Sequence, residues 1–343
     1  MDWAGDTSQW DRVPRLYLHL GGRLLPTWAT MGGLGAVVGA ALFVALSRDA
    51  GAPSVTSISI VAANVAGFYG WTAISRRWRD RARYVLLEHA LVAAGSTVAI
   101  AAATGASPTQ VLDPWVVALA LALGVGRIGC LLSGCCHGKP ATTGIRYRWR
   151  PPWLLGPVWH AVRVYPLQAV ESAGLVALAA VGTQLLSHPG LAAAAVPAAY
   201  AAIRFELELW RGDDRRYIGP LSHNQWACLA LVPLVAMLDL RVAATTAAIL
   251  VALAVVQPRR FVPPAIIVTS ETHMAALAAA VTAARAGQEA QVAGVVLGPD
   301  GHGGITARGA CLPLLPGELQ VIAAAVEARA ASKAVRDGAQ PAP

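Results

Sequence analysis

The feature that most limits how this chain can fold is a series of apolar runs, most of them about 20 residues long. They cover residues 26–46, 54–74, 84–104, 112–133, 167–186, 191–209, 220–238 and 242–256, and the last is the shortest. A helix of about 20 apolar residues crosses the hydrocarbon core of a bilayer, which is roughly 30 Å thick. The pattern therefore predicts an all-α polytopic membrane protein with seven or eight transmembrane helices.

The composition favours the same class of protein. Hydrophobic residues make up 56% of the 343 residues and charged residues only 13%, whereas about 25% is usual in soluble domains. The net charge of +8 comes almost entirely from arginines in loops and at the ends of the runs, which indicates anionic lipid headgroups as partners and not nucleic acid. The five cysteines, at positions 130, 135, 136, 228 and 311, form no regular framework of disulfides.

Changes in composition divide the chain into parts. Residues 1–25 lack the short apolar region and cleavage site of a signal peptide, so we expect a membrane domain over 26–258 that retains its first span. Within it, the Trp-, Pro- and Arg-rich stretch 138–165 predicts a small extra-membrane head segment. Residues 259–343 predict a small soluble α/β appendage with a disordered end, formed by a strand (265–270), a helix (274–287), a strand (291–299) and a helix (317–335).

Two arginines lie inside apolar runs, where an ionised side chain is costly and points to function. Arg127 is near the end of the fourth run and Arg204 is within the sixth, and each has more helix or loop beyond it. A guanidinium group stays protonated and donates through a planar fork, so two of them form a clamp suited to phosphate. We expect Asp113 and Glu208 to supply the counter-charges.

Other polar residues in the runs share helical spacing or adjacency. They are Arg204, Glu208 and Arg211 at i, i+4 and i+7, Gln168 and Glu171 at i and i+3, and the neighbours Glu88 and His89. Such spacing places the first two groups on single helix faces. Helix packing by Glu88 and His89, and a flanking position for Arg211, remain alternatives to a functional role.

Residues 124–149, GVGRIGCLLSGCCHGKPATTGIRYRW, contain a C-x4-C-C-H pattern. Three interpretations are open: ligands for zinc or copper, a reactive thiolate favoured by Arg127 and Lys139, or passive packing. The pattern lacks the C-x2-C knuckle of structural zinc sites, and no second ligand cluster accompanies it. We therefore expect neither a metal nor another cofactor.

Four segments resemble those of a known family. GRIGCLLSGCCHGKP (126–140) resembles the prolipoprotein diacylglyceryl transferase signature, G-R-I-G-N-F-x-N-G-E-x-x-G. YPLQAVES (165–172) is similar to that family's P-S-Q-L-Y-E, IRFELELWRGD (203–213) to R-F-x-x-E-x-x-R, and SHNQW (222–226) to S-x-x-Q. The resemblance extends over about residues 20–238 and leaves the appendage out.

The resemblance implies a transferase of lipoprotein biosynthesis, embedded as a multi-pass protein in the plasma (inner) membrane. Its reaction moves an sn-1,2-diacylglyceryl group from phosphatidylglycerol to the thiol of a lipobox cysteine. The implied partners are phosphatidylglycerol, other membrane lipids and prolipoprotein signal peptides, with no nucleic acid. The implied catalytic residues are Arg127 and Arg204, which hold the leaving phosphate, and His89 as the base. The implied substrate-binding residues are Asp113, Cys130, Cys135, Gly138, Gln168, Glu171, Glu208 and Arg211.

The chain departs from the family pattern at three of these positions. Cys130 stands where the family has asparagine, Cys135 stands where it has glutamate, and His89 is followed by Ala-Leu and not Gly-Gly. Two alternatives follow. One is an altered paralogue that binds phospholipid or uses another thiol acceptor. The other is a membrane metal-binding or thiol-redox protein that uses the cysteines together with His137.

Overall fold

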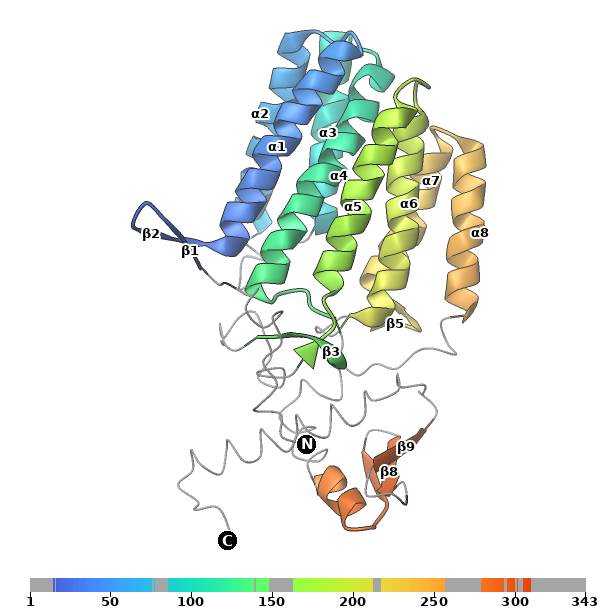
Figure 1. Cartoon of the computed structure of the whole chain (residues 1–343). Coiled ribbons are helices and arrows are strands. Elements are labelled where there is room, and N and C mark those ends of the chain that lie inside the picture. Colours follow the sequence, from blue (N-terminus) through green and yellow to red (C-terminus); the bar gives the residue numbers. More distant parts are fainter. Residues whose placement is uncertain are drawn as a thin grey trace.

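The computed structural model describes residues 15, 17–75, 77, 86–138, 140–147, 163–211, 217–256, 279–292, 295–299, 301 and 305–309. Eight long helices dominate this part of the chain (Figure 1): α1 (Thr27–Asp49), α2 (Ser54–Ser75), α3 (Leu86–Thr104), α4 (Pro108–Ser133), α5 (Leu167–Leu185), α6 (Leu191–Leu207), α7 (His223–Ala236) and α8 (Leu240–Val256). Each predicted apolar run is therefore helical.

Three of these helices are long and apolar enough to cross a membrane. They are α1, α2 and α4, with 23, 22 and 26 residues, and α8 is a shorter apolar helix. Only 17%, 17% and 39% of their most apolar windows are buried inside the protein. Most of their apolar side chains therefore face outward, as they do when lipid surrounds a helix. The helices thus give the protein the character of a membrane protein.

The helices run alternately in opposite directions, and short and long connections alternate between them (Figure 1). The short connections are 50–53, 105–107, 186–190 and 237–239. The opposite end, where α4 and α6 end and α5 and α7 begin, is called the head end below. It carries the paired strands β3 (Pro140–Arg146) and β4 (Arg163–Val164), and the hairpin of β5 (Tyr217–Ile218) and β6 (Leu221–Ser222). Residues 148–162 of the predicted head segment lie outside the described residues.

A further hairpin precedes the bundle, formed by β1 (Tyr17–Leu20) and β2 (Arg23–Pro26). Its two-residue turn is Gly21-Gly22, and both glycines have positive φ. Two positive φ angles suit the type I′ turn that joins tightly paired antiparallel strands. The turn thus explains the glycine pair in a segment for which the sequence predicted no element.

Helices α1 and α4 pack closely because glycines on α1 face the backbone of α4. A β-carbon on Gly35 would overlap the carbonyl oxygen of Ala122, and one on Gly39 would lie 2.7 Å from the Ala122 β-carbon. Small residues that allow two backbones to approach are typical of helix pairs in membranes. This contact fixes α4, which carries the signature, against α1.

We expect Gly35→Val to destabilise the protein by about 1–3 kcal/mol, the usual cost of overpacking a close contact. Gly33→Val is the matched control, because a β-carbon at Gly33 meets no atom within 4 Å. The measurement is the thermal unfolding of both variants in detergent micelles. Equal midpoints for the two variants would contradict the described contact.

The C-terminal region differs from its predicted β-α-β-α order. In the described part, residues 279–285 are helical and are followed by an antiparallel sheet of β7 (Ala290–Val292), β8 (Val295–Pro299) and β9 (Ile305–Gly309), in that order. The predicted single strand 291–299 is thus two antiparallel strands, β7 and β8, in which Val292 pairs with Val295. The predicted strand 265–270 and helix 317–335 lie outside the described residues.

Candidate functional site

Two arginines from different helices share one carboxylate. The Nε atom of Arg127 on α4 lies 2.9 Å from Oε2 of Glu171, and the NH1 atom of Arg204 on α6 lies 3.6 Å from Oε1 of the same residue. The exposed fractions of these side chains are 13% for Arg127, 9% for Arg204 and 0% for Glu171. The structure therefore unites three of the predicted site residues in one largely buried ion cluster.

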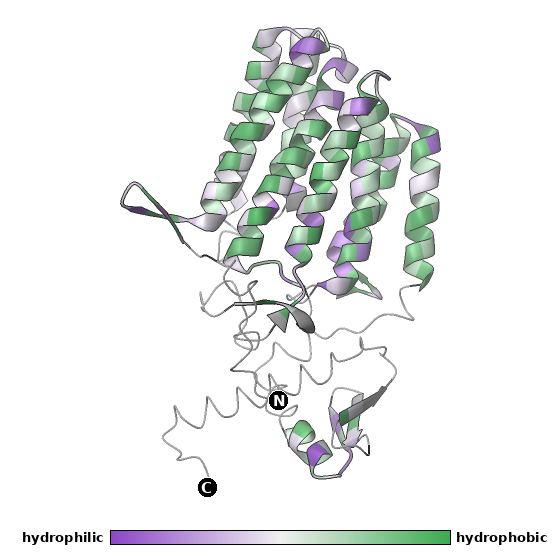
Figure 2. Ribbon diagram, in the orientation of Figure 1, coloured by the Kyte–Doolittle hydropathy of each residue, from purple (hydrophilic) through white to green (hydrophobic). Residues whose placement is uncertain are grey.

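Alternating helix directions explain why these distant positions meet. Arg127 is close to the end of α4, Glu171 is close to the start of α5, and Arg204 is close to the end of α6. All three positions therefore lie near the head end. Figure 2 shows hydrophilic positions near the lower ends of these helices, within an otherwise apolar bundle.

Glu208 is the second carboxylate of the cluster. Its Oε1 accepts hydrogen bonds from Arg204 and, at 3.1 Å, from Asn224, while its Oε2 accepts one from Ser222 at 2.9 Å. Ser222 also caps α7 through a reciprocal capping box with Gln225. The S-x-x-Q segment thus begins α7 and anchors Glu208.

Arg211 does not continue the helical face on which Arg204 and Glu208 were predicted. The α-helix ends at Leu207, a 3-10 turn follows over Glu208–Trp210, and Arg211 is extended, with φ −71° and ψ 137°. Its side chain is nevertheless buried, and its backbone pairs with Gly138. Arg211 therefore lies beside the signature turn because the chain is extended after the helix ends, and not because of its helical spacing from Arg204.

Tyr200 also belongs to the cluster, although it was not among the predicted site residues. Its hydroxyl donates a hydrogen bond of 2.8 Å to Oε1 of Glu171. It lies on α6 four residues before Arg204, as Glu208 lies four residues after it. This position four residues before Arg204 is the sequence pattern that could have identified Tyr200, because residues four apart share a helix face.

The signature turn is held by its glycines and by Gln168. Gly134 ends α4 in the left-handed conformation, with φ +81°. Gly138 lies so close to neighbouring backbone that a β-carbon would be 2.7 Å from the carbonyl oxygen of Tyr165. The Nε2 atom of Gln168 donates to the Cys135 carbonyl at 2.7 Å. Both predicted residues, Gly138 and Gln168, thus position the turn beside Arg127.

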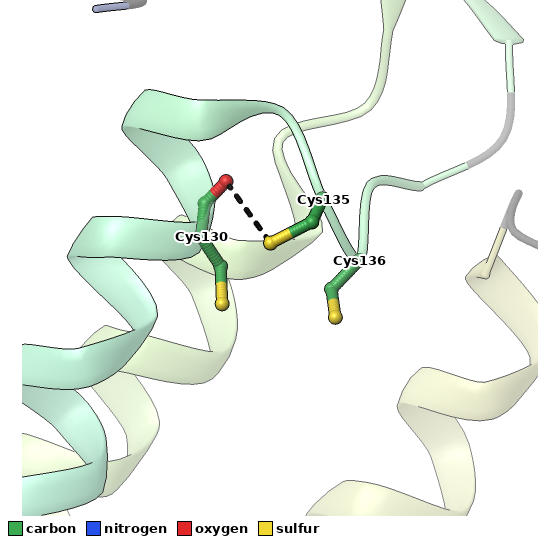
Figure 3. Close-up of side chains that lie close together, drawn as sticks. All are labelled: Cys130, Cys135 and Cys136. Atoms are coloured by element: carbon green, nitrogen blue, oxygen red, sulfur yellow. Dashed lines mark hydrogen bonds between the residues drawn. The ribbon is translucent and has the colours of Figure 1, made fainter. Parts of the chain in front are cut away.

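Three cysteines meet at this turn, as Figure 3 shows. The sulfur atoms of Cys130, Cys135 and Cys136 all lie within 4.8 Å of one another, and all three residues are half-buried free thiols. Arg127 NH1 lies 4.0 Å from the sulfur of Cys130. Hydrogen bonds from Cys130 and Cys135 hold the pKa of Cys136 well below its usual value, whereas hydrogen bonding to Cys130 and Cys136 raises the pKa of Cys135. The three sulfurs therefore act directly on one another's pKa.

His89 is placed on α3 and contacts α2. Its Nε2 atom lies 3.0 Å from the hydroxyl of Thr72, and its ring centroid is 4.6 Å from that of Phe68. The neighbouring Glu88 accepts a 2.9 Å hydrogen bond from Trp71. These contacts correspond to the helix-packing alternative for the pair. They do not connect His89 with the two arginines, although it lies at the head end too.

Asp113 is not brought to the arginines. Its carboxylate accepts hydrogen bonds from the backbone N–H groups of Gly190 (2.6 Å) and Ala193 (2.7 Å) at the start of α6. It lies fourteen residues before Arg127, which is about 21 Å along α4. Its charge therefore stabilises the N-terminus of α6 at the opposite end of the bundle, and it does not serve as the counter-charge that the sequence suggested.

We expect Asp113→Ala to destabilise the protein by about 1–2 kcal/mol, because two N–H groups of α6 lose their acceptor. Asp113→Asn retains one acceptor oxygen and should lose less. Unfolding midpoints of the two variants in detergent provide the measurement. No loss of stability in either variant would show that this carboxylate does not cap α6.

Comparison with known proteins gives a consistent result. Residues 89–241 match the family model described as prolipoprotein diacylglyceryl transferase. The chain is 35% identical over 129 residues to the phosphatidylglycerol–prolipoprotein diacylglyceryl transferase 2 of Clostridium perfringens, a match that covers 36% of this chain and 48% of that protein. The phosphatidylglycerol–prolipoprotein diacylglyceryl transferase of Clostridium tetani is 31% identical over 122 residues, which cover 35% of this chain and 48% of the relative.

A shorter match supports the same assignment. The phosphatidylglycerol–prolipoprotein diacylglyceryl transferase of Dehalococcoides mccartyi is 39% identical over 67 residues, which cover 20% of this chain and 25% of the relative. The chain thus spans about half the length, or less, of the curated relatives that it matches. The matched segment contains Arg127, Glu171, Arg204 and Glu208, so the resemblance inferred from the motifs is confirmed. Over residues 89–241, the chain is similar to the prolipoprotein diacylglyceryl transferase family.

Proposed function

We propose that this protein is an integral membrane transferase that moves a diacylglyceryl group from phosphatidylglycerol to the lipobox cysteine of a prolipoprotein. The observation that carries the proposal is the bridge from Arg127 through Glu171 to Arg204. The names of the relatives supply the substrates. The chemistry of the bridge fits a lipid whose leaving group is a phosphate ester.

The charges of the cluster suit a phosphodiester. Arg127, Arg204 and Arg211 contribute three positive charges, and Glu171 and Glu208 contribute two negative ones, which leaves a net charge of +1 among these five residues. The phosphodiester of phosphatidylglycerol carries a single negative charge and would balance it. Because the cluster is largely buried, this attraction is much stronger than it would be in water.

The reaction requires stabilisation of charge on the leaving phosphate. The cysteine sulfur bonds to the glyceryl carbon, the bond from that carbon to the phosphate oxygen breaks, and its electron pair leaves with glycerol phosphate. Fixed cations that face this oxygen lower the barrier without reorganising during the reaction. Glu171 holds both guanidinium groups in place, and Tyr200 donates to Glu171. The thiol proton passes to a base. We keep His89 as the candidate for this role on the family resemblance, although its described contacts are with Thr72 and Phe68 and not with the arginines.

The remaining site residues position the signature turn in this proposal. Gly138 and Gln168 fix the turn that contains Cys135, and Cys130 lies beside Arg127. The eight helices would span the plasma (inner) membrane as one domain over 26–258, with the appendage 259–343 outside it. Prolipoprotein signal peptides and anionic lipids would reach the cluster from within the bilayer.

Complementation tests the proposal directly. A bacterial strain depleted of its own transferase should grow when it expresses this chain and should not grow when it expresses Arg127→Ala at the same membrane level. Failure of the well-expressed wild-type chain to restore growth would contradict the proposal. That outcome would favour the altered paralogue, which binds phospholipid or uses another thiol acceptor.

A further inference from the structure

The three cysteines at the head end of α4 bring their side chains together although they do not share one helix face. Cys130 lies in the last turn of α4, and Cys135 and Cys136 follow after the helix has ended at Gly134. Successive side chains on a regular backbone point in different directions, yet the sulfurs of all three lie within 4.8 Å of one another (Figure 3). The backbone must therefore bend specifically to unite them.

The backbone of Cys136 provides that bend. Among the described residues, it is the one non-glycine residue with positive φ, at +59°. This conformation costs roughly 1–2 kcal/mol for a residue with a β-carbon. Backbone strain of this kind persists where the surrounding structure fixes it, and it is concentrated at functional sites. At Cys136 the result is a third sulfur beside the other two.

We propose that Cys130, Cys135 and Cys136 bind a soft thiophilic metal ion, Cu(I), through three thiolate sulfurs. Thiolates select Cu(I) and zinc among common biological metals. A closed zinc site takes four ligands in a tetrahedron. Within the part of the chain that the structure describes, the ligand group holds three sulfurs and no histidine nitrogen or carboxylate oxygen. Three soft ligands suit the low coordination number of Cu(I).

The surroundings fit a negatively charged metal–thiolate group. One Cu(I) with three thiolates carries a net charge of −2, since each thiol loses its proton on binding and no electron is transferred. Arg127 and Arg211 both act electrostatically on Cys136 and would compensate this charge. The three thiols are half-buried, so a small ion can reach them while bulk water is largely excluded.

Titration with Cu(I) tests the site in the purified full-length protein. The Cys311→Ser background removes the cysteine outside the described residues, and the protein is kept reduced and free of oxygen in competition with a coloured Cu(I) chelator. We expect one Cu(I) per chain and sulfur-only coordination by X-ray absorption. Adding Cys136→Ser should lower the affinity by more than the ~10–100-fold that loss of an outer-shell partner costs. Cys228→Ser, which alters a buried cysteine of α7, is the matched control and should bind like the background.

Thiol protection gives a second measurement that needs no cluster variant and therefore does not depend on how such a variant folds. Bound Cu(I) should shield Cys130, Cys135 and Cys136 from maleimide labelling, as read by mass spectrometry. The proposal is overturned if the chelator removes all Cu(I), if nitrogen or oxygen enters the coordination shell, or if Cys228→Ser weakens binding as much as Cys136→Ser. Both measurements are independent of lipid transfer, so they stand or fall separately from the proposed function.

Discussion

Glu171→Gln is expected to destabilise the protein by about 3–5 kcal/mol, the usual cost of removing one partner from a buried ion pair. The loss is at the upper end because one carboxylate serves two guanidinium groups. Without it, Arg127 and Arg204 repel each other in a site with little solvent to screen them. Reversible unfolding by SDS in mild detergent micelles measures the change in the free energy of unfolding.

Glu88→Gln is the matched control for this experiment. Glu88 lies near the head end on α3, and glutamine keeps an acceptor oxygen for the Trp71 side chain that now donates to Glu88. The control should therefore cost much less than Glu171→Gln. Equal losses in the two variants would show that Glu171 does not hold the arginines together, and the preorganised phosphate site would have to be abandoned.

Arg127→Ala is expected to lower kcat/KM for diacylglyceryl transfer by about 100- to 1000-fold, as removal of one preorganised donor from a buried oxyanion site does. The substitution removes the guanidinium group that would contact the leaving phosphate, whereas Glu171 keeps Arg204 and Tyr200 as partners. The release of glycerol phosphate from phosphatidylglycerol vesicles measures the rate.

The matched control for that variant is Arg241→Ala. Arg241 is an exposed arginine near the start of α8, at the end of the bundle opposite the head end. Its removal changes the net charge of the protein by the same amount and should leave the rate close to that of the wild type. A similar fall in rate for both variants would mean that Arg127 acts through overall charge and not through the phosphate.

The helices could be predicted well because the length of an apolar run is a physical requirement of the bilayer. Each predicted run has a helical counterpart, and the spacing of Arg204 and Glu208 correctly indicated that they meet. The number of membrane-crossing helices stays a prediction, since three helices meet the length and hydropathy expected of a span. The hairpin over 290–299 was missed because two short strands and one long strand share the same apolar composition.

The site was predicted in part. Arg127 and Arg204 lie in one cluster as their charges suggested, because buried charges must find partners. The carboxylate that they share is Glu171 and not Asp113. Asp113 was wrongly assigned to the two arginines. Its carboxylate binds two backbone N–H groups at the start of α6, and the position of α6 beside it cannot be inferred from spacing along the chain. Arg211 was assigned by helical spacing to a helix that has already ended. The bend at Cys136 could not be predicted, because positive φ is rare in residues other than glycine.

The most direct test of the central claim uses purified protein in phosphatidylglycerol vesicles with a synthetic lipobox peptide. The account predicts that the peptide gains a diacylglyceryl group as a thioether on its cysteine, detected by mass spectrometry, with one glycerol phosphate released per peptide modified. The related enzyme of Clostridium perfringens serves as the positive control in the same vesicles. An unmodified peptide, in vesicles where that control is active and this protein is folded, would contradict the account.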